Sequence, residues 1–228
     1  FIDVILLQET HFTAIESARA LEVEWGGTGF WSLGSYRSKG VGILVRPGLR
    51  YNCYYNLSDH EGRLLVVDIK FGDLDARIIN VYAPNNHRER RQFFQSVETH
   101  INATQHAVII AGDFNCVENT ALDRSNQEGS YASEILAGWR QTYGFIDAFR
   151  HLHKNVQATT WSGGGVSARL DRCYVSSNLQ NSVQEVSIEP CVDFDHSLVT
   201  LRLRCQTSEP DHGPGYWKCN SSVLDDEH

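Results

Sequence analysis

The sequence AVIIAGDFN, residues 107–115, joins a run of five apolar residues to a polar turn. A short apolar run that ends in a turn signal is typical of a buried β-strand, and Gly112 permits a tight turn directly after it. Asp113 and Asn115 then point to the same side if the backbone stays extended, because side chains alternate along a strand. A carboxylate beside an amide can activate and orient a water molecule, although Asp and Asn are also common in turns for purely structural reasons. This stretch therefore predicts a buried strand with a candidate site at its end.

Outward from this stretch, strand-like runs dominate the chain. Several of them alternate apolar and polar residues, which indicates half-buried strands rather than helices. Amphipathic helices are expected over residues 89–104 and 131–142, with a shorter one over 13–21. The expected strands are residues 4–7, 41–45, 64–71, 77–82, 107–111, 170–175 and 198–203. With turn residues between these runs, the pattern predicts an α/β domain in which sheets pack face to face with helices outside.

Length, charge and cysteine usage narrow the class of protein. A chain of 228 residues fits one domain with a large core, here residues 1–205, and the polar, Gly/Pro-containing segment 206–228 is typical of a linker. The apolar runs are too short to cross a bilayer, so no membrane span is expected. The net charge of -8 argues against a sequence-blind nucleic-acid binder, but not against an enzyme that clusters acidic groups around a metal. Six cysteines without zinc-type spacing predict reduced thiols in an intracellular protein.

Other strands also end in polar groups that packing does not require. Glu9 directly follows the apolar strand 4–7, where a carboxylate can reach a hard cation such as Mg²⁺. The simpler alternative is a glutamate that faces solvent. Tyr82 closes the strand 77–82, and its hydroxyl can contact a phosphate or merely be the polar tip of a packing residue.

The last two clusters pair a histidine with carboxylates. His196, preceded by Asp195, is suited to proton transfer near neutral pH, although a single histidine before a strand is often structural. Asp171 opens the strand 170–175 and can fix the tautomer of His196 by accepting from its ring nitrogen, as the third member of a catalytic triad does. The alternative is an ion pair of Asp171 with Arg169 or Arg172.

The order of these clusters is more specific than any one of them. They follow one another as Gln8-Glu9-Thr10, Tyr82-Ala83-Pro84-Asn85, Gly112-Asp113-Phe114-Asn115, Arg169-Leu170-Asp171 and Asp195-His196-Ser197. This succession resembles the endonuclease/exonuclease/phosphatase superfamily, which includes apurinic-site repair endonucleases and pancreatic deoxyribonuclease. The resemblance runs from about Val4 to Leu203.

Within that superfamily the sequence is most similar to the endonuclease domains of LINE (non-LTR) retrotransposon polyproteins. The similarity is carried by QETH at 8–11, GVGILV at 40–45 and LDRS at 122–125. The segment GPGYWKCN, residues 213–220, resembles the connector that leads from such an endonuclease to a reverse transcriptase.

The resemblance implies a deoxyribonuclease-like, four-layer α/β sandwich with two mixed sheets flanked by helices. The superfamily normally begins with an additional strand that carries an Asn and completes the metal and phosphate site. Because this sequence starts after that point, the resemblance predicts that the first strand is missing and that residues 1–228 alone are weakened or inactive.

The resemblance also implies a site that hydrolyses phosphodiesters in line and leaves a 3′-hydroxyl and a 5′-phosphate. Glu9 and Asp195 would bind the metal, Mg²⁺ or alternatively Mn²⁺. Asp113 would activate the attacking water or assist the leaving oxygen, and Asn115 would orient that centre. His196, held by Asp171, would contact the non-bridging phosphate oxygens, with Tyr82 near the scissile phosphate. The implied catalytic set is Glu9, Tyr82, Asp113, Asn115, Asp171 and His196.

The implied partner is DNA. Asn85, Arg124 and Thr160 match positions near the DNA face of the superfamily, and Arg88-Glu89-Arg90-Arg91 offers a basic surface, although such a run at a helix start is usually just solvated. The resemblance further implies a parent polyprotein in which a reverse transcriptase follows, and a nuclear location.

Two other functions are compatible with the same residues. One is a phosphatase of the same fold that acts on lipid or inositol phosphates, since such relatives share the Asp113, Asn115, Asp195 and His196 pattern. The other is a catalytically inactive module derived from a degenerate retroelement, which the truncated start favours and the retained polar residues do not.

Overall fold

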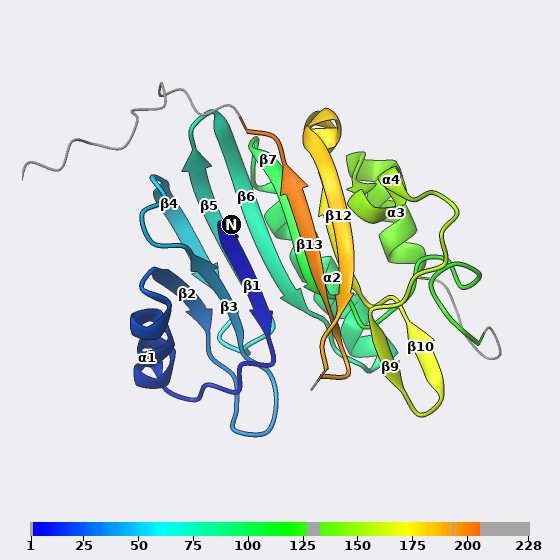
Figure 1. Cartoon of the computed structure of the whole chain (residues 1–228), viewed down its shortest axis with the longest axis horizontal. Helices are drawn as coiled ribbons and strands as arrows, with labels where there is room; N and C mark the ends of the chain where they lie inside the picture. The colour runs from blue at the N-terminus through cyan, green and yellow to red at the C-terminus, as the bar shows by residue number, and fades with distance from the viewer. Residues whose placement is uncertain (1, 127–132, 193, 206–228) are drawn as a thin grey trace, which may run out of the picture.

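The computed structural model describes residues 2–126, 133–192 and 194–205, and a six-stranded sheet forms its centre (Figure 1). The strand order is β4-β5-β6-β7-β11-β8, with β6 and β7 parallel and the other neighbours antiparallel. The strands are β4 (Asn52–Ser58), β5 (Leu64–Phe71), β6 (Leu74–Tyr82), β7 (Ala107–Asp113), β8 (Ile146–Asp147) and β11 (Asp171–Val175).

Two small antiparallel sheets face this central sheet. One has the order β1-β3-β2, from β1 (Val4–Gln8), β3 (Val41–Val45) and β2 (Thr28–Ser32), and the other pairs β12 (Val183–Pro190) with β13 (Ser197–Leu203). A separate ribbon joins β9 (Trp161–Gly163) to β10 (Val166–Ala168). The deoxyribonuclease-like fold is confirmed, but only the central sheet is mixed, and the facing layer consists of two sheets rather than one.

Helices cover the other side of the central sheet. Figure 1 shows α2 (His87–Asn102) and α3 (Glu134–Tyr143) behind the strands, while α1 (Ile15–Trp25) lies beside β2. The short helices α4 (Ala148–Leu152) and η1 (Ser177–Ser182) pack with β12 in a third apolar cluster. The expected helices over 13–21, 89–104 and 131–142 correspond to α1, α2 and α3, and residues 131 and 132 lie outside the described residues, as does the expected linker 206–228.

The central strands bury side chains on both faces. Along β5, Leu64 and Val66 pack towards the helices, whereas Leu65, Val67 and Ile69 pack towards the three-stranded sheet. A strand covered on both sides reads as a continuous apolar run, and this explains why residues 64–71 are predictable as a strand. The two cores hold the ends of these strands rigidly, so polar residues at those ends have fixed positions.

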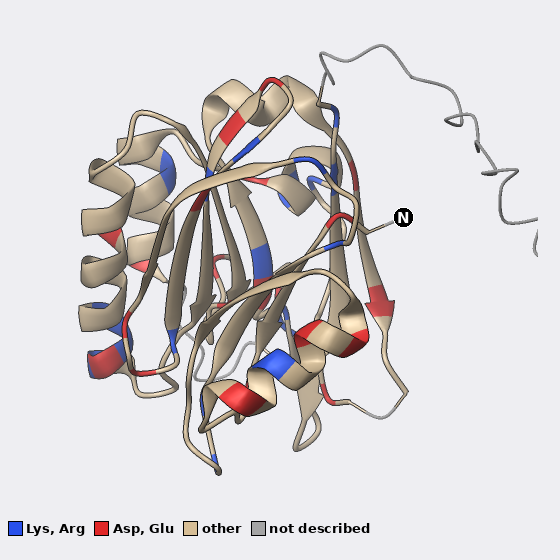
Figure 2. Cartoon of the chain, turned by 90° about the vertical axis from the view of Figure 1, so that its left-hand side faces the viewer, with Lys and Arg blue, Asp and Glu red and all other residues tan. Residues whose placement is uncertain are grey.

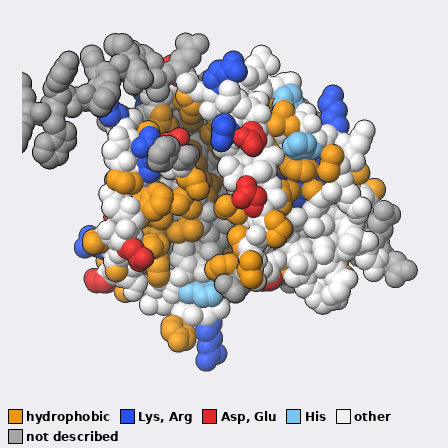
Figure 3. Space-filling model, in the orientation of Figure 1, with side chains coloured by type: hydrophobic (Ala, Val, Ile, Leu, Met, Phe, Trp, Pro, Cys, Tyr) orange, Lys and Arg blue, Asp and Glu red, His pale blue; other side chains and the backbone are white. Residues whose placement is uncertain are grey.

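The small sheets leave two strand edges open. Within the described residues, β1 pairs only with β3, and β13 pairs only with β12. The two edges flank a gap in the layer seen in Figure 1, and hydrophobic side chains show on this face in Figure 3. The apolar strand β1 is consequently only half-buried along its whole length.

Charge is dispersed over the molecule. Figure 2 shows acidic and basic residues interspersed along the chain, with α1 carrying both signs. None of the helices in the described part of the chain is long and apolar enough to span a bilayer.

Candidate active site

Strand register places three of the predicted site residues side by side. β6 pairs in parallel with β7 so that Tyr82 lies opposite Asp113, and β7 pairs antiparallel with β11 so that Asp113 lies opposite Asp171. Residues far apart in the sequence therefore meet on three adjacent strands, at the lower edge of the sheet in Figure 1. β1 ends and β13 begins at the same edge, and they bring in Glu9 and His196.

Glu9 reaches this row from the facing sheet. The Tyr82 hydroxyl donates a hydrogen bond to Glu9 Oε1. Burial, followed by the hydrogen bond with Glu9, raises the pKa of Tyr82, so the phenol stays protonated as a donor. Glu9 itself has a left-handed backbone (φ 53°), an uncommon conformation for a residue with a side chain. Its side chain is 53% exposed and is thus open to a ligand.

A buried amide sets the position of Glu9. Asn80, with no exposed surface, donates from Nδ2 to the carbonyls of Leu7 (2.9 Å) and Gly42 (2.8 Å), and its Oδ1 accepts from Gln8 Nε2 (2.7 Å). Asn80 thereby joins the central sheet to β1 and β3 directly before Glu9. No role was predicted for Asn80 from the sequence, although a single amide within the apolar run of β6 is a signal of such a contact.

His196 and Asp171 form the predicted pair. His196 Nδ1 lies 2.8 Å from Asp171 Oδ2, so in this pairing Nδ1 carries the proton and Nε2 faces away from Asp171. Burial lowers the pKa of His196, but the hydrogen bond and the charge of Asp171, together with Asp113 and Asp195, outweigh burial and raise this pKa to about 9. The imidazole is therefore cationic at neutral pH. The alternative ion pairs of Asp171 with Arg169 or Arg172 do not form, because both arginines pair with Asp123 and Asp147.

Asp113 is the most buried carboxylate of the site, with 4% of its surface exposed. Burial, and next the charge of Asp171, raise its pKa to about 7, while a hydrogen bond from the Asn115 backbone amide (2.8 Å) and the charge of His196 work in the opposite direction. Asp113 thus exchanges its proton near neutral pH, as a general base must.

Asn115 is tied to the backbone rather than free. Its Nδ2 donates to the carbonyl of Ala83 (2.8 Å), and its backbone is left-handed (φ 48°). This contact links the turn after β7 to the turn after β6 and leaves the amide oxygen of Asn115 as the group that can orient a ligand beside Asp113.

Asp195 is an exposed carboxylate next to His196. Its Oδ2 accepts a hydrogen bond from Trp161 Nε1 (3.0 Å), a contact that the sequence did not predict. Glu9 and Asp195 are hard oxygen donors, and Mg²⁺ is usually bound through one or two carboxylates and several waters. In the described ranges no three His, Cys, Asp or Glu side chains form a closed metal cage, so the donor set fits such a sparse, hydrated ion and not structural zinc.

The three expected DNA contacts are placed differently from one another. Asn85 is exposed, and its carbonyl accepts from Arg90 (2.7 Å). Arg124 is half-buried and its backbone pairs with Ala168. Thr160, by contrast, is 1% exposed and is not available to a phosphate.

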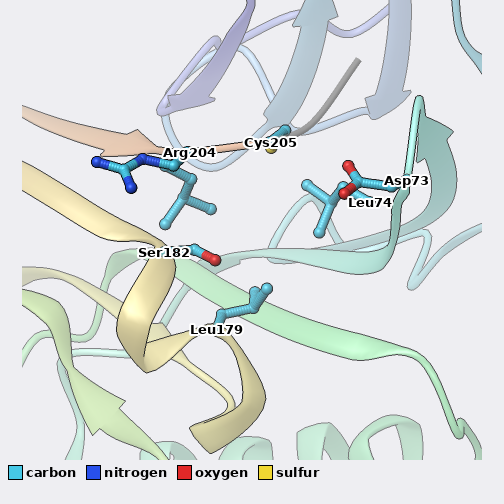
Figure 4. Close-up of a pocket in the computed structure, with 7 residues that line it drawn as sticks. Asp73, Leu74, Leu179, Ser182, Arg204 and Cys205 are labelled. Carbon is cyan, nitrogen blue, oxygen red and sulfur yellow. The ribbon is translucent and has the colours of Figure 1, made fainter. Parts of the chain in front are cut away.

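Part of the candidate site is open to solvent, because Glu9 and Asp195 are exposed. A hollow of about 120 Å³ lies at the other end of the sandwich, between the start of β6 and the end of β13, and is lined by residues that include Leu74, Leu179 and Arg204 (Figure 4). A second, shallower hollow lies beside α1. Neither is lined by a candidate catalytic residue.

Comparisons with known proteins agree with this geometry. The chain is 32% identical over 231 residues to the Transposon TX1 uncharacterized 149 kDa protein of Xenopus laevis, a match that covers 98% of this chain and 17% of that protein. It is 25% identical over 171 residues to an exodeoxyribonuclease of Bacillus subtilis (strain 168), covering 63% of this chain and 64% of the relative. The chain thus spans less than two thirds of either relative, and the predicted similarity to a transposon protein is confirmed.

Solved structures share the fold at low sequence identity. The AP endonuclease LMAP from Leishmania major has a TM-score of 0.71 at 18% identity over 90% of this chain and 79% of its own. The 3′-5′ exonuclease NExo from Neisseria meningitidis has a TM-score of 0.68 at 19% identity over 88% of this chain and 89% of its own. A structure of a variant of the 3′ phosphatase NExo from Neisseria, bound to a product DNA hairpin, has a TM-score of 0.67 at 18% identity over 89% of both chains.

The sequence pattern of the Endonuclease/Exonuclease/phosphatase family matches residues 1–208, which include every strand end described above. This chain belongs to the Endonuclease/Exonuclease/phosphatase family.

Proposed function

We propose that this chain is a metal-dependent DNA endonuclease domain that hydrolyses one phosphodiester bond and nicks DNA. As a family member it is an enzyme of the phosphodiesterase type. The observation that carries the more specific proposal is the alignment of Tyr82, Asp113 and Asp171 on adjacent strands, with Glu9 and His196 bonded to the two ends of that row.

The protonation states of His196 and Asp113 support different catalytic roles for the two residues. His196, cationic below its pKa of about 9, stabilises negative charge on the non-bridging oxygens of a phosphate. Asp113, with a pKa of about 7, accepts the proton of the attacking water or assists the leaving oxygen. Asp171 acts through His196, whose ring it orients. Tyr82 donates its one proton to Glu9 and would lie near the scissile phosphate.

Enzymes of this family generally depend on a divalent metal ion. Glu9 and Asp195 would hold Mg²⁺, with Mn²⁺ as the alternative. When bound, such an ion neutralises charge that develops on the phosphate. The Tyr82 and Trp161 hydrogen bonds orient these two carboxylates before an ion arrives.

The biological setting is proposed from the relatives. The TX1 protein is a transposon product about six times as long as the matched segment, since the match covers 17% of it. We infer that this domain nicks target DNA during retrotransposition, in a polyprotein with a reverse transcriptase, and that it acts in the nucleus.

DNA is favoured over a small phosphate ester as substrate. Part of the candidate site is open to solvent, and pockets for small ligands are usually concave and largely enclosed. A DNA 3′-phosphatase activity is the second candidate, because the Neisseria structure with this fold and a DNA hairpin is named a 3′ phosphatase. Asn85 and Arg124 are the proposed DNA contacts that the structure leaves near the surface.

The test is nicking of supercoiled plasmid by residues 1–228 in Mg²⁺, with enzyme in excess. Asp113→Asn and His196→Ala should each lower the single-turnover rate by about 100-fold or more, as expected for loss of acid–base catalysis. Asp73→Asn, the same chemical change at an exposed position beside the opposite hollow, should leave the rate unchanged.

Two further substrates separate the alternatives. Faster turnover of a phosphoinositide than of plasmid would replace the endonuclease by a phosphatase, and release of phosphate from a 3′-phosphorylated hairpin without nicking would favour the second candidate.

A further inference from the structure

Residues 160–162 connect the two elements that carry the histidine–aspartate pair. Thr160 Oγ1 accepts hydrogen bonds from the backbone amides of Leu170 (3.0 Å) and Asp171 (2.9 Å), directly before β11. On its other side, the Thr160 carbonyl accepts from the amide of Ser197 (2.7 Å), the residue that follows His196. Thr160 is thus bonded to Asp171 and to the residue that follows His196.

The next two residues extend this connection to Asp195. Trp161 and His196 form an isolated antiparallel bridge, and the amide of Ser162 donates to the carbonyl of Asp195 (3.0 Å). The indole of Trp161 donates to the Asp195 carboxylate (3.0 Å). The loop before β13 is therefore held by residues 160–162 as well as by the pairing of β13 with β12.

The acceptor capacity of the Thr160 hydroxyl oxygen is taken up within the fold. Its side chain is buried, its Oγ1 already accepts two amide protons, and its backbone amide donates to the carbonyl of Ala168 (2.9 Å). Removal of the hydroxyl would leave the amides of Leu170 and Asp171 without this acceptor, and a backbone donor withdrawn from water is unfavourable without a partner. The hydroxyl therefore has a structural reason to be present that needs no contact with DNA.

We propose that Thr160 and Trp161 are positioning residues, which fix Asp171 against His196 and orient the Asp195 carboxylate. This inference rests on the proposed function, because it assigns these residues to the same site. It replaces the DNA contact expected of Thr160 with an effect exerted through Asp171 and His196.

The first test uses nuclear magnetic resonance of the whole chain and needs no activity. In Thr160→Val, which keeps the side-chain shape but removes the acceptor, the amide protons of Leu170 and Asp171 should exchange with solvent at least about tenfold faster. The ring resonances of His196 should shift or broaden. Thr160→Ser should restore both, and Thr28→Val, the same change on the exposed first residue of β2, should alter neither. Unchanged His196 resonances in a folded Thr160→Val chain would refute the proposal.

Kinetics of plasmid nicking provide the second test. A positioning role predicts that Thr160→Val lowers kcat at least about tenfold and leaves KM within about twofold, because binding of DNA is retained. A raised KM with unchanged kcat would instead show a DNA contact and would overturn the assignment. Trp161→Phe, which keeps an aromatic side chain but removes the indole donor to Asp195, should lower kcat severalfold. It tests the proposal if Thr160→Val does not fold.

The two tests keep the proposals apart. The nicking assay bears on the proposed function, whereas the resonance experiment decides by itself whether Thr160 holds Asp171 and His196 in place.

Discussion

Asp113 shows how a single residue is made reactive at the expense of stability. The carboxylate is buried at the end of β7, beside Asp171, and its pKa rises to about 7 from 3.8 in an unstructured chain. Because its pKa is higher in the folded state, Asp113 stabilises the fold only while it is protonated. This contribution to the free energy of unfolding is fully present below pH 3.8 and is lost as the pH rises through 7.

Asp113→Asn should remove this loss. The amide keeps an oxygen that can accept from the Asn115 amide but carries no charge. We expect the metal-free variant to lose less stability between pH 4 and 7 than the wild type and to be more stable at pH 7.5, by an amount on the order of 2–4 kcal/mol. Urea denaturation in EDTA at several pH values measures this, and parallel stability curves for the two proteins would contradict it. The pKa of His196 rises from 6.5 to about 9, so the stability that His196 contributes is also lost with rising pH. This loss occurs in the wild type and in the Asp113→Asn variant.

At this scale the sequence indicated candidate site residues but not their surroundings. Glu9, Asp113 and His196 stand at the ends of apolar runs, and a run can be recognised locally. The buried positions of Thr160 and Asn80 could not be predicted, because their partners lie on strands whose register depends on the whole fold.

At the scale of elements, a buried network of ion pairs joins Asp123, in the loop that follows β7, to β11 and α4. Asp123 accepts from Arg150, Arg169 (2.8 Å) and Arg172 (3.0 Å), and both of the latter also reach Asp147 at the start of α4. Burial raises the pKa of Asp123, but the charges of Arg172 and Arg169 outweigh burial and hold this pKa well below its usual value. Because Arg169 stands two residues before Asp171, the network also secures the start of β11.

Loss of the central carboxylate should therefore be costly. Asp123→Ala leaves buried guanidinium groups without their partner and is expected to destabilise the chain by about 3–5 kcal/mol. Glu185→Ala, which breaks an exposed pair with Arg202, should cost less than about 1 kcal/mol. Chemical denaturation of both variants measures the difference, and equal losses would show that the network adds little.

Strands buried on both faces were predicted from the sequence, and so were the half-buried edge strands β1 and β13. β5, β6 and β7 appear in the sequence as apolar runs, and α2 begins at His87, two residues before its predicted start, because Asn86 caps the amides of Arg88 and Glu89. The edge strand β4 and the ribbon β9–β10 were not predicted. They mix exposed and half-buried residues, and such strands carry no clear apolar pattern.

The whole molecule combines an acidic net charge of -8 with a site made largely of carboxylates. Mutual repulsion of Glu9, Asp113, Asp171 and Asp195 is only partly offset by the cationic His196. Such an arrangement attracts a divalent cation. Glu9 follows β1 and Asp195 precedes β13, and each of these strands is an edge strand that pairs on one side only in the described part of the chain.

Metal binding should therefore stabilise the folded chain, even where nicking is slow. An ion that binds only the folded state adds about 1.4 kcal/mol at ten times its Kd, which for a domain of this size corresponds to a rise in Tm of roughly 3–5 °C. We expect this rise with Mg²⁺, its loss in Glu9→Gln, and its retention in Glu24→Gln, the same change at an exposed position on α1. Differential scanning calorimetry with Mg²⁺ or with Na⁺ at equal ionic strength measures the shift. If Mg²⁺ stabilised wild type and Glu9→Gln equally, Glu9 would not be a metal ligand, because a uniform shift is what general screening of an acidic protein produces.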